Sequence, residues 1–290
     1  MTETALPAIE RQEWLDTVGD PLTNAVHSAY PGEVGQRIKN FMHGVWLGHP
    51  FHPLLTDIPI GAWMTSAVLD VAEQRTGDEG YGRAADVAIC FGLVGATGAA
   101  ITGLTDWSET YGGPKRVGLL HGLLNVAATT LFTASYVLRS RGQRESGRGL
   151  SVAGLIVAST AAYLGGSLVY RDRIGVDHAD PIDDHDFSPA LPSADLHEGD
   201  KRAVDVEKSS VFVARQHGRV CALAEHCSHL GGPLSEGTLH DGSIVCPWHG
   251  SEFALEDGSV INGPATNPQP SYEVREEDGA IAVKPRYANP

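Results

Sequence analysis

Two short segments of this chain each contain one cysteine and one histidine. The first pair is Cys227 and His229, and the second, after residues 230–245, is Cys246 and His249. Thiolates and imidazoles both bind soft and borderline metals, so the segments together offer two sulfur and two nitrogen donors. A [2Fe–2S] cluster with two cysteines on one iron and two histidines on the other needs this set. We therefore expect these four residues to bind one such cluster per chain.

Two other arrangements use the same residues. A disulfide between Cys227 and Cys246 leaves both histidines without a role. A structural zinc site accepts two cysteines and two histidines, but zinc fingers usually place like ligands together in each loop. The cluster is the better explanation. The remaining cysteines, Cys90 and Cys221, form no even framework of disulfides, so nothing requires an oxidising compartment.

The residues around both pairs are typical of loops that direct backbone N–H groups toward sulfur. Gly231-Gly232-Pro233 follows the first pair, and the second pair contains Pro247 and is followed by Gly250. The segments HCSHLGGPLSEG and CPWHGSEF resemble the Rieske ferredoxin family, and the resemblance covers about residues 195–285. It implies an exposed histidine-bound edge of the cluster and a Trp248 that shields the sulfides.

Three positions refine this resemblance. Rieske proteins of respiratory cytochrome bc complexes carry extra cysteines where this chain has Gly231-Gly232 and Trp248, which indicates the ferredoxin and oxygenase type. Ser251 resembles a serine that donates to a cluster sulfide in high-potential members, and such bonds raise the potential. The family's second donor, a tyrosine, is Phe253 here. The resemblance implies an intermediate potential, unless Ser251 simply faces solvent.

The sequence after about Leu196 predicts a β-rich domain. Asp-Gly pairs at 241–242, 257–258 and 278–279 lie between short apolar runs, and such pairs favour tight hairpin turns. We expect an antiparallel barrel or sandwich of about 90 residues, with the ligand loops at one tip.

Four long apolar stretches occupy the first part of the chain. A helix that crosses a bilayer core of ~30 Å needs ~20 apolar residues, and each stretch has this length. Their many small residues suit close helix packing in a membrane. A soluble four-helix bundle is the alternative. The stretches cover residues 53–72, 84–104, 117–138 and 150–170.

A second resemblance involves the histidines at the start of this region. His49-Pro50-Phe51-His52-Pro53 resembles the His-Pro-x-His-Pro motif of an uncharacterised family of four-helix membrane domains, over about residues 40–177. His121 lies near the start of the third stretch, which runs in the same direction as the first, so His52 and His121 share one face. They are candidates for a haem or metal site. Otherwise they cap helices or bond buried carbonyls, with Asp57 as a partner.

The fold class that follows is an α+β multidomain protein, with an N-terminal four-helix transmembrane bundle and a C-terminal all-β Rieske domain. The expected parts are a polar N-terminal segment at 1–40, the membrane domain at 41–176, an acidic linker at 177–194 and the Rieske domain at 195–290.

Charge favours a protein partner over nucleic acid. Residues 177–290 contain 20 acidic and 8 basic side chains, whereas nucleic-acid binding needs a basic face. A redox partner with a basic patch fits this charge. We therefore expect a membrane-anchored one-electron carrier rather than a stand-alone enzyme. The alternative is an electron-donating subunit of an oxygenase, reductase or quinone-oxidising complex encoded elsewhere.

The sequence favours a multi-pass protein of the cell membrane. Residues 1–40 are polar, so we expect no cleavable signal peptide. Lysines and arginines are evenly divided between the two sides. The dense arginines at 139–148 favour a cytoplasmic position for the loop there, which would place the cluster domain outside. Because iron–sulfur domains are assembled inside the cell, we expect the cluster domain to face the cytoplasm.

Overall fold

The computed structural model describes residues 5–180, 182 and 184–286. These residues form two compact units. The helical unit contains residues up to 35 and residues 51–174, and the β unit contains residues 36–50 and those from 175 onward. The chain thus passes between the units three times. Residues 36–50 fold with the C-terminal unit although they precede the first long helix.

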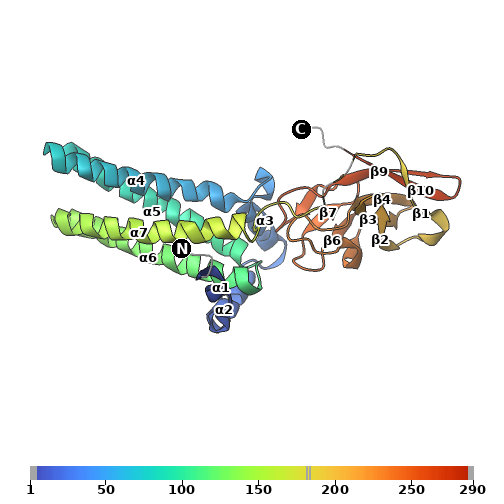
Figure 1. Cartoon of the computed structure of the whole chain (residues 1–290), viewed down its shortest axis with the longest axis horizontal. Helices are drawn as coiled ribbons and strands as arrows, with labels where there is room; N and C mark the ends of the chain where they lie inside the picture. The colour runs from blue at the N-terminus through green and yellow to red at the C-terminus, as the bar shows by residue number, and fades with distance from the viewer. Residues whose placement is uncertain (1–4, 181, 183, 287–290) are drawn as a thin grey trace. The chain divides into compact units, whose positions relative to one another are not determined.

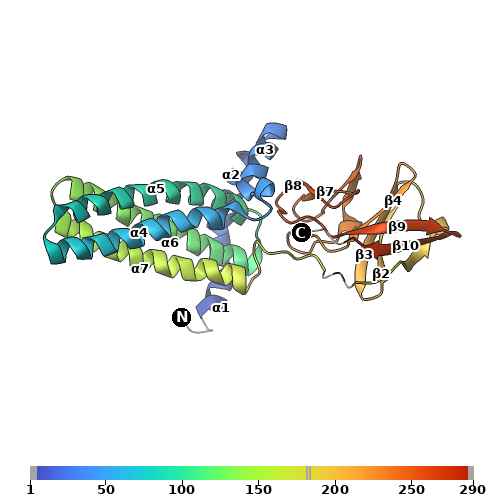
Figure 2. The same ribbon diagram turned by 90° about the horizontal axis from the view of Figure 1, so that it is seen from above.

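Four long helices build the helical unit, and they lie side by side in both views (Figures 1 and 2). Most of their packing is within two hairpins, α4 with α5 and α6 with α7. Gly77 and Gly142 end the first helix of each hairpin in the left-handed conformation, with φ of 72° and 80°. The helices are α4 (Phe51–Thr76), α5 (Glu79–Trp107), α6 (Gly112–Ser140) and α7 (Arg144–Tyr170).

These helices confirm the four predicted apolar stretches; three extend beyond the prediction at both ends, and α7 extends beyond it only at its start. Each has 26 to 29 residues, which is long and apolar enough to cross a membrane. Only 17 to 33% of the residues in their most apolar segments are buried within the unit. The outward face of the bundle is therefore largely apolar.

Inside the bundle, α4 and α6 meet through large side chains. The rings of Trp63 and Phe132 stack with centroids 4.1 Å apart, and Ile89 and Ala128 pack in the same buried cluster. This contact joins the two hairpins at the middle of the bundle.

Charged side chains join the hairpins near their turns. Arg139 of α6 has no exposed side-chain surface, and its guanidinium donates to both carboxylate oxygens of Asp70 on α4, at 2.7 and 2.5 Å. Asp86 pairs with Arg144 at 2.6 Å, and Glu73 pairs with Arg148 at 2.5 Å. The first hairpin supplies the acids and the second supplies the bases.

The polar N-terminal segment is helical. Helices α1 (Ala5–Glu10) and α2 (Asp16–Ser28) pack on α6, and α3 (Gly32–His43) follows them. Ion pairs fix this contact, with Asp16 2.6 Å from Arg116 and Asp20 2.7 Å from Lys115.

The β unit contains two antiparallel sheets, as the turn pattern predicted. One sheet has the order β1-β10-β9-β4-β3-β2, and the other has the order β5-β6-β7-β8. Asp278-Gly279 turns β9 into β10 with φ of 52° and 79°, the left-handed geometry that favours this pair. The strands are β1 (Ser188–Pro192), β2 (Lys201–Val206), β3 (Ser209–Gln216), β4 (Arg219–Ala224), β5 (Thr238–His240), β6 (Ser243–Val245), β7 (Glu252–Ala254), β8 (Val260–Asn262), β9 (Ser271–Glu277) and β10 (Ala280–Pro285).

Part of the predicted acidic linker is structured. Strand β1 lies within residues 177–194 and pairs with β10. His178 also donates its backbone N–H to the Ser228 carbonyl at 2.9 Å. The boundaries predicted for the four parts of the chain stay a prediction.

The Asp70–Arg139 pair gives a test of the bundle. The change Asp70→Asn removes the nearer counterion of the buried guanidinium and leaves only Asp86, at 3.3 Å; losing one partner of a buried ion pair costs about 3–5 kcal/mol. We expect a clearly lower thermal midpoint for the detergent-solubilised protein, measured by circular dichroism. Glu79→Gln is the matched control, because Glu79 pairs with Arg83 on the exposed surface at 3.7 Å and should contribute little. Equal midpoints for both variants would contradict the proposed role.

Candidate functional site

The two predicted ligand pairs lie in loops with the same backbone hydrogen bonds. In the loop between β4 and β5, Cys227 donates its N–H to the Gly232 carbonyl at 2.9 Å, and Gly231 donates to the Cys227 carbonyl at 2.8 Å. The loop between β6 and β7, residues 246–251, repeats both bonds at equivalent positions, at 2.8 and 3.2 Å. Each loop therefore folds back on its own cysteine.

Glycines make this loop shape possible. Gly231 and Gly250 occupy equivalent positions and have φ of 78° and 73°, where a side chain would add strain. Gly232 is needed for space, because a Cβ there would lie 2.8 Å from the Cys246 sulfur and 3.0 Å from Cγ of Trp248. The glycines keep the region beside the sulfurs open.

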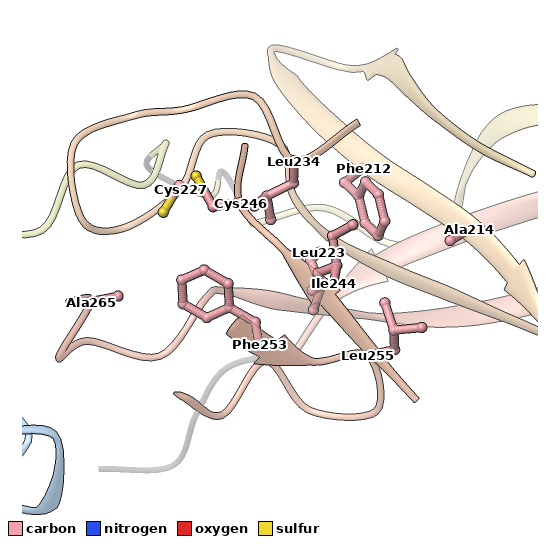
Figure 3. Packing of buried hydrophobic residues seen from close by; sticks show 10 residues of the cluster. All are labelled: Phe212, Ala214, Leu223, Cys227, Leu234, Ile244, Cys246, Phe253, Leu255 and Ala265. Carbon is pink, nitrogen blue, oxygen red and sulfur yellow. The ribbon is translucent and has the colours of Figure 1, made fainter. Parts of the chain in front are cut away.

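The four predicted ligands come together as two pairs. The sulfurs of Cys227 and Cys246 lie near one another at the edge of a buried apolar cluster (Figure 3), and a hydrogen bond joins the two side chains. The rings of His229 and His249 have centroids 5.0 Å apart. Nδ1 of His229 is buried and has no hydrogen-bond partner among the residues that the structure describes, as a metal-binding nitrogen would. The donor set thus fits a metal cluster.

The arrangement of these four side chains also distinguishes the cluster from the disulfide and the zinc site. All four cysteines are free thiols, so the structure does not contain the Cys227–Cys246 disulfide. Within the described ranges, no three histidine, cysteine or acidic side chains are arranged to hold a single metal ion. One zinc ion needs its four ligands around one point, whereas a two-iron cluster takes one pair on each iron. The arrangement favours the cluster.

Hydrogen bonds to sulfur set the charge of the thiols. The bond from Cys227 lowers the pKa of Cys246 to about 7, with help from the backbone N–H groups of Trp248 and His249. The same contact, with burial, raises the pKa of Cys227. One thiolate is therefore already favoured near neutral pH, and it accepts bonds that would also stabilise a cluster thiolate.

The imidazole of His229 is held neutral. Burial lowers its pKa well below the usual value, and nearby His249, His43, His178 and Lys39 lower it further. Since a neutral imidazole is the form that binds metal, this environment suits a ligand. His43 and Lys39 belong to residues 36–50, so that segment contributes to the electrostatics of the site.

Gln269 fixes the first loop and was not predicted from the sequence. Its side chain is almost fully buried. The amide accepts from the Ser228 N–H at 2.9 Å and donates to the Ala224 and His226 carbonyls, both at 2.7 Å. It therefore joins the ligand loop to the end of β4. Nothing in the sequence near Gln269 marks this role.

Ser251 lies in the site and not in solvent. It is fully buried, forms a hydrogen bond with the Cys227 side chain, and accepts the Ala265 N–H at 3.0 Å. Phe253 is also fully buried and fills the apolar cluster behind the thiols (Figure 3). Trp248 is 49% exposed, and its ring packs on Gly232 beside the Cys246 sulfur.

Asn40 supports the same region from α3. Its amide nitrogen donates to Oδ1 of Asn262 at 2.9 Å and to the Ile261 carbonyl at 3.3 Å, and its Oδ1 accepts the Gly263 N–H at 3.0 Å. The loop held in this way continues to Ala265, whose N–H orients Ser251. A chain of bonds thus runs from α3 to a ligand sulfur.

Known proteins match the two parts of the chain separately. The family described as "Predicted membrane protein (DUF2231)" matches residues 48–178, and the Rieske [2Fe-2S] domain matches residues 186–273. The 3-phenylpropionate/cinnamic acid dioxygenase ferredoxin subunit of Escherichia coli (strain K12) is 34% identical over 102 residues, which are 35% of this chain and 95% of that protein. The chain belongs to the Rieske [2Fe–2S] family.

Other matches cover the same region. Apoptosis-inducing factor 3 of Mus musculus is 30% identical over 90 residues, 31% of this chain but only 15% of that protein. The ferredoxin of carbazole 1,9a-dioxygenase from Nocardioides aromaticivorans IC177 is 28% identical over 35% of this chain and all of that one, with a TM-score of 0.34. The predicted [2Fe–2S] cofactor is confirmed by the family, while the assignment of individual ligands stays a prediction.

Ser251 gives a test of how this Rieske site is tuned. In Ser251→Ala the sulfur loses one donor, and donors to sulfur raise the potential. We expect a midpoint lower by ~20–65 mV, which corresponds to one hydrogen bond of about 0.5–1.5 kcal/mol in a one-electron couple. Redox titration followed by paramagnetic resonance measures the shift.

The control is Ser243→Ala, since this buried serine donates to Glu252 instead of sulfur. Asn40→Ala should lower the midpoint potential less than Ser251→Ala does. The double variant should have the midpoint of Ser251→Ala alone, because Asn40 acts through the Ser251 hydroxyl. An unchanged midpoint in Ser251→Ala would show that the Ser251 hydroxyl does not raise the potential.

Proposed function

We propose that the protein is a membrane-anchored one-electron carrier. In this proposal Cys227 and Cys246 bind one iron of the [2Fe–2S] cluster, and His229 and His249 bind the other. The convergence of these two donor pairs carries the proposal. The match to a dioxygenase ferredoxin subunit over 95% of its length supports it. The bound cluster supplies the one-electron chemistry, while the protein holds, exposes and tunes it.

Burial differs between the two ends of the site. The cysteines are almost fully buried, with 1% and 3% of their surface exposed, whereas both histidines are partly exposed. The histidine side is therefore the route by which a partner would come closest to the cluster. Residues of the loops around it, Trp248 above all, would contact that partner.

A redox partner follows from an electron carrier, and charge indicates its kind. The excess of acidic side chains in residues 177–290 favours a partner that presents a basic patch. The alternative assignment of the chain is an electron-donating subunit. The similarity to a dioxygenase ferredoxin subunit favours an oxygenase or its reductase as the enzyme that it would serve. Substrate-dependent reoxidation of the reduced cluster by the isolated protein would instead indicate an enzyme.

The bilayer is the proposed surrounding of α4–α7. Large apolar side chains point outward along all four helices and are more than half exposed, a surface that water disfavours. Matches to a predicted membrane family support the same placement. Examples of these side chains are Met64, Val68, Val87, Phe91, Val94, Val126, Val152 and Ile156.

The ligand assignment is tested by paramagnetic resonance on dithionite-reduced membranes. The wild-type protein should give the low average g value of a mixed-ligand cluster. Cys246→Ala and His249→Ala should each abolish that signal, because each removes one of only two protein ligands to an iron. Cys221→Ala is the matched control, since this cysteine lies on β4 outside the ligand loops. A retained signal in either ligand variant would refute the assignment.

Membrane placement is tested by extraction and protease access. The protein should stay in membranes washed with alkaline carbonate, because four apolar helices hold it. With the cluster domain in the cytoplasm, a protease should cleave it in inverted vesicles but not in intact spheroplasts. Cleavage only in spheroplasts would place the domain on the opposite side, and release by carbonate would refute the anchor.

A further inference from the structure

The two helical hairpins share identical residues at a set of equivalent positions, which indicates an internal repeat. A shift of 69 positions aligns α4 with α6, and a shift of 62 positions aligns α5 with α7. Internal repeats of this kind build many membrane bundles. Residues identical in both copies include the pairs His52 and His121, Leu54 and Leu123, Leu55 and Leu124, Ser66 and Ser135, Gly92 and Gly154, Ala99 and Ala161, and Gly103 and Gly165.

The structure places equivalent positions of the two copies against one another. Trp63 stacks on Phe132, and Asp70 pairs with Arg139, each across the shift that relates α4 to α6. The hairpins are therefore related by an approximate twofold axis along the bundle. Any residue of α4 that points to this axis meets its own counterpart from α6.

At one level of the bundle the residues that meet are histidines. The ring centroids of His52 and His121 are 6.4 Å apart. Nδ1 of His52 lies 2.8 Å from the Ala99 carbonyl, and Nδ1 of His121 lies 2.8 Å from the Ala161 carbonyl. A carbonyl oxygen only accepts, so each Nδ1 carries the hydrogen and each Nε2 keeps a lone pair. Metal-binding histidines are oriented in this way.

Each ring also lies directly against a glycine of its neighbouring helix. A Cβ on Gly103 would lie 2.6 Å from Cε1 of His52, and one on Gly165 would lie 2.9 Å from Cε1 of His121. Both copies therefore keep the glycine and the carbonyl that hold the ring. The predicted Asp57 is not the bonding partner, because the carbonyls of Ala99 and Ala161 are.

The copies differ at one contact. The Asn125 amide nitrogen lies 3.2 Å from Nε2, 3.5 Å from Nδ1 and 3.0 Å from the carbonyl of His121. Its counterpart in α4, Thr56, instead donates to the Pro53 carbonyl at 2.7 Å. Asn125 can keep its bond to the His121 carbonyl while Nε2 takes another partner.

We propose that Nε2 of His52 and Nε2 of His121 bind the iron of one b-type haem from opposite sides. A porphyrin supplies four nitrogens, so the protein needs to add only two axial ligands. Two imidazoles on one metal have centroids ~6 Å apart, since each metal–nitrogen bond is about 2.0–2.1 Å. In the described part of the chain no third histidine, cysteine or acid joins this pair, which a bare ion would need.

This site goes beyond the proposed carrier function, since it adds a second redox centre in the helical unit. The two claims have separate readouts. Pyridine haemochrome absorbance counts haem, and paramagnetic resonance of the reduced protein reports the cluster. Loss of one signal without the other tells which claim has failed.

The test uses the full chain, produced with added iron and 5-aminolevulinate and purified in detergent. We expect one haem per chain and the reduced spectrum of a six-coordinate haem. His52→Gln and His121→Gln should each lower bound haem at least tenfold and keep the cluster signal, because glutamine can still donate to the carbonyl but is not expected to bind iron.

His197→Gln, which changes a mostly exposed histidine of the β unit, should leave haem content unchanged. Asn125→Ala should retain haem, since it removes only a competing contact. The proposal is overturned if folded wild-type protein with its cluster binds no haem after reconstitution, or if both glutamine variants keep full haem. Elemental analysis that finds a metal ion beyond the two irons of the cluster, in protein without haem, would overturn it in favour of a bare ion.

Discussion

The candidate site of the β unit depends on two separate loops that bring one cysteine and one histidine each to the same place. The loops achieve this with one repeated pattern, in which each cysteine bonds the backbone of its own loop and a glycine takes the left-handed conformation. Backbone N–H groups point at the sulfurs, and Gln269 ties the first loop to β4. Because buried polar groups need partners, these bonds fix the loops before any cofactor is present.

The sequence was most informative where chemistry depends on neighbouring residues. The ligand pairs, the Asp-Gly turns and the four apolar helices are all local patterns, and the structure contains the turns and helices where they were expected. Gln269 and Asn40 could not be found in this way. An amide side chain has no typical surroundings in sequence, and the bonds by which Gln269 and Asn40 support the site reach residues 41 or more positions away.

The charged residues of the helical unit could not be interpreted from local sequence patterns. In the sequence, Asp70 and Asp86 interrupt apolar stretches. Arg139 and Arg144 lie outside the predicted stretches, in the loop between two of them. In the structure they neutralise one another between hairpins. A charge inside such a bundle is tolerated when a partner from another helix accompanies it. Of these two pairs, Asp70 and Arg139 stand at equivalent positions of the two hairpins.

The division of the chain has a consequence for biosynthesis. Asn40 leaves the ribosome early, but the residues that it bonds, 261–263, come near the end of the chain. Between them the whole of α4–α7 must be made. The β unit therefore cannot finish folding during translation of its first piece, and a fragment that starts after α7 lacks part of its own structure. Maturation of the iron–sulfur domain must wait until the helices are in place.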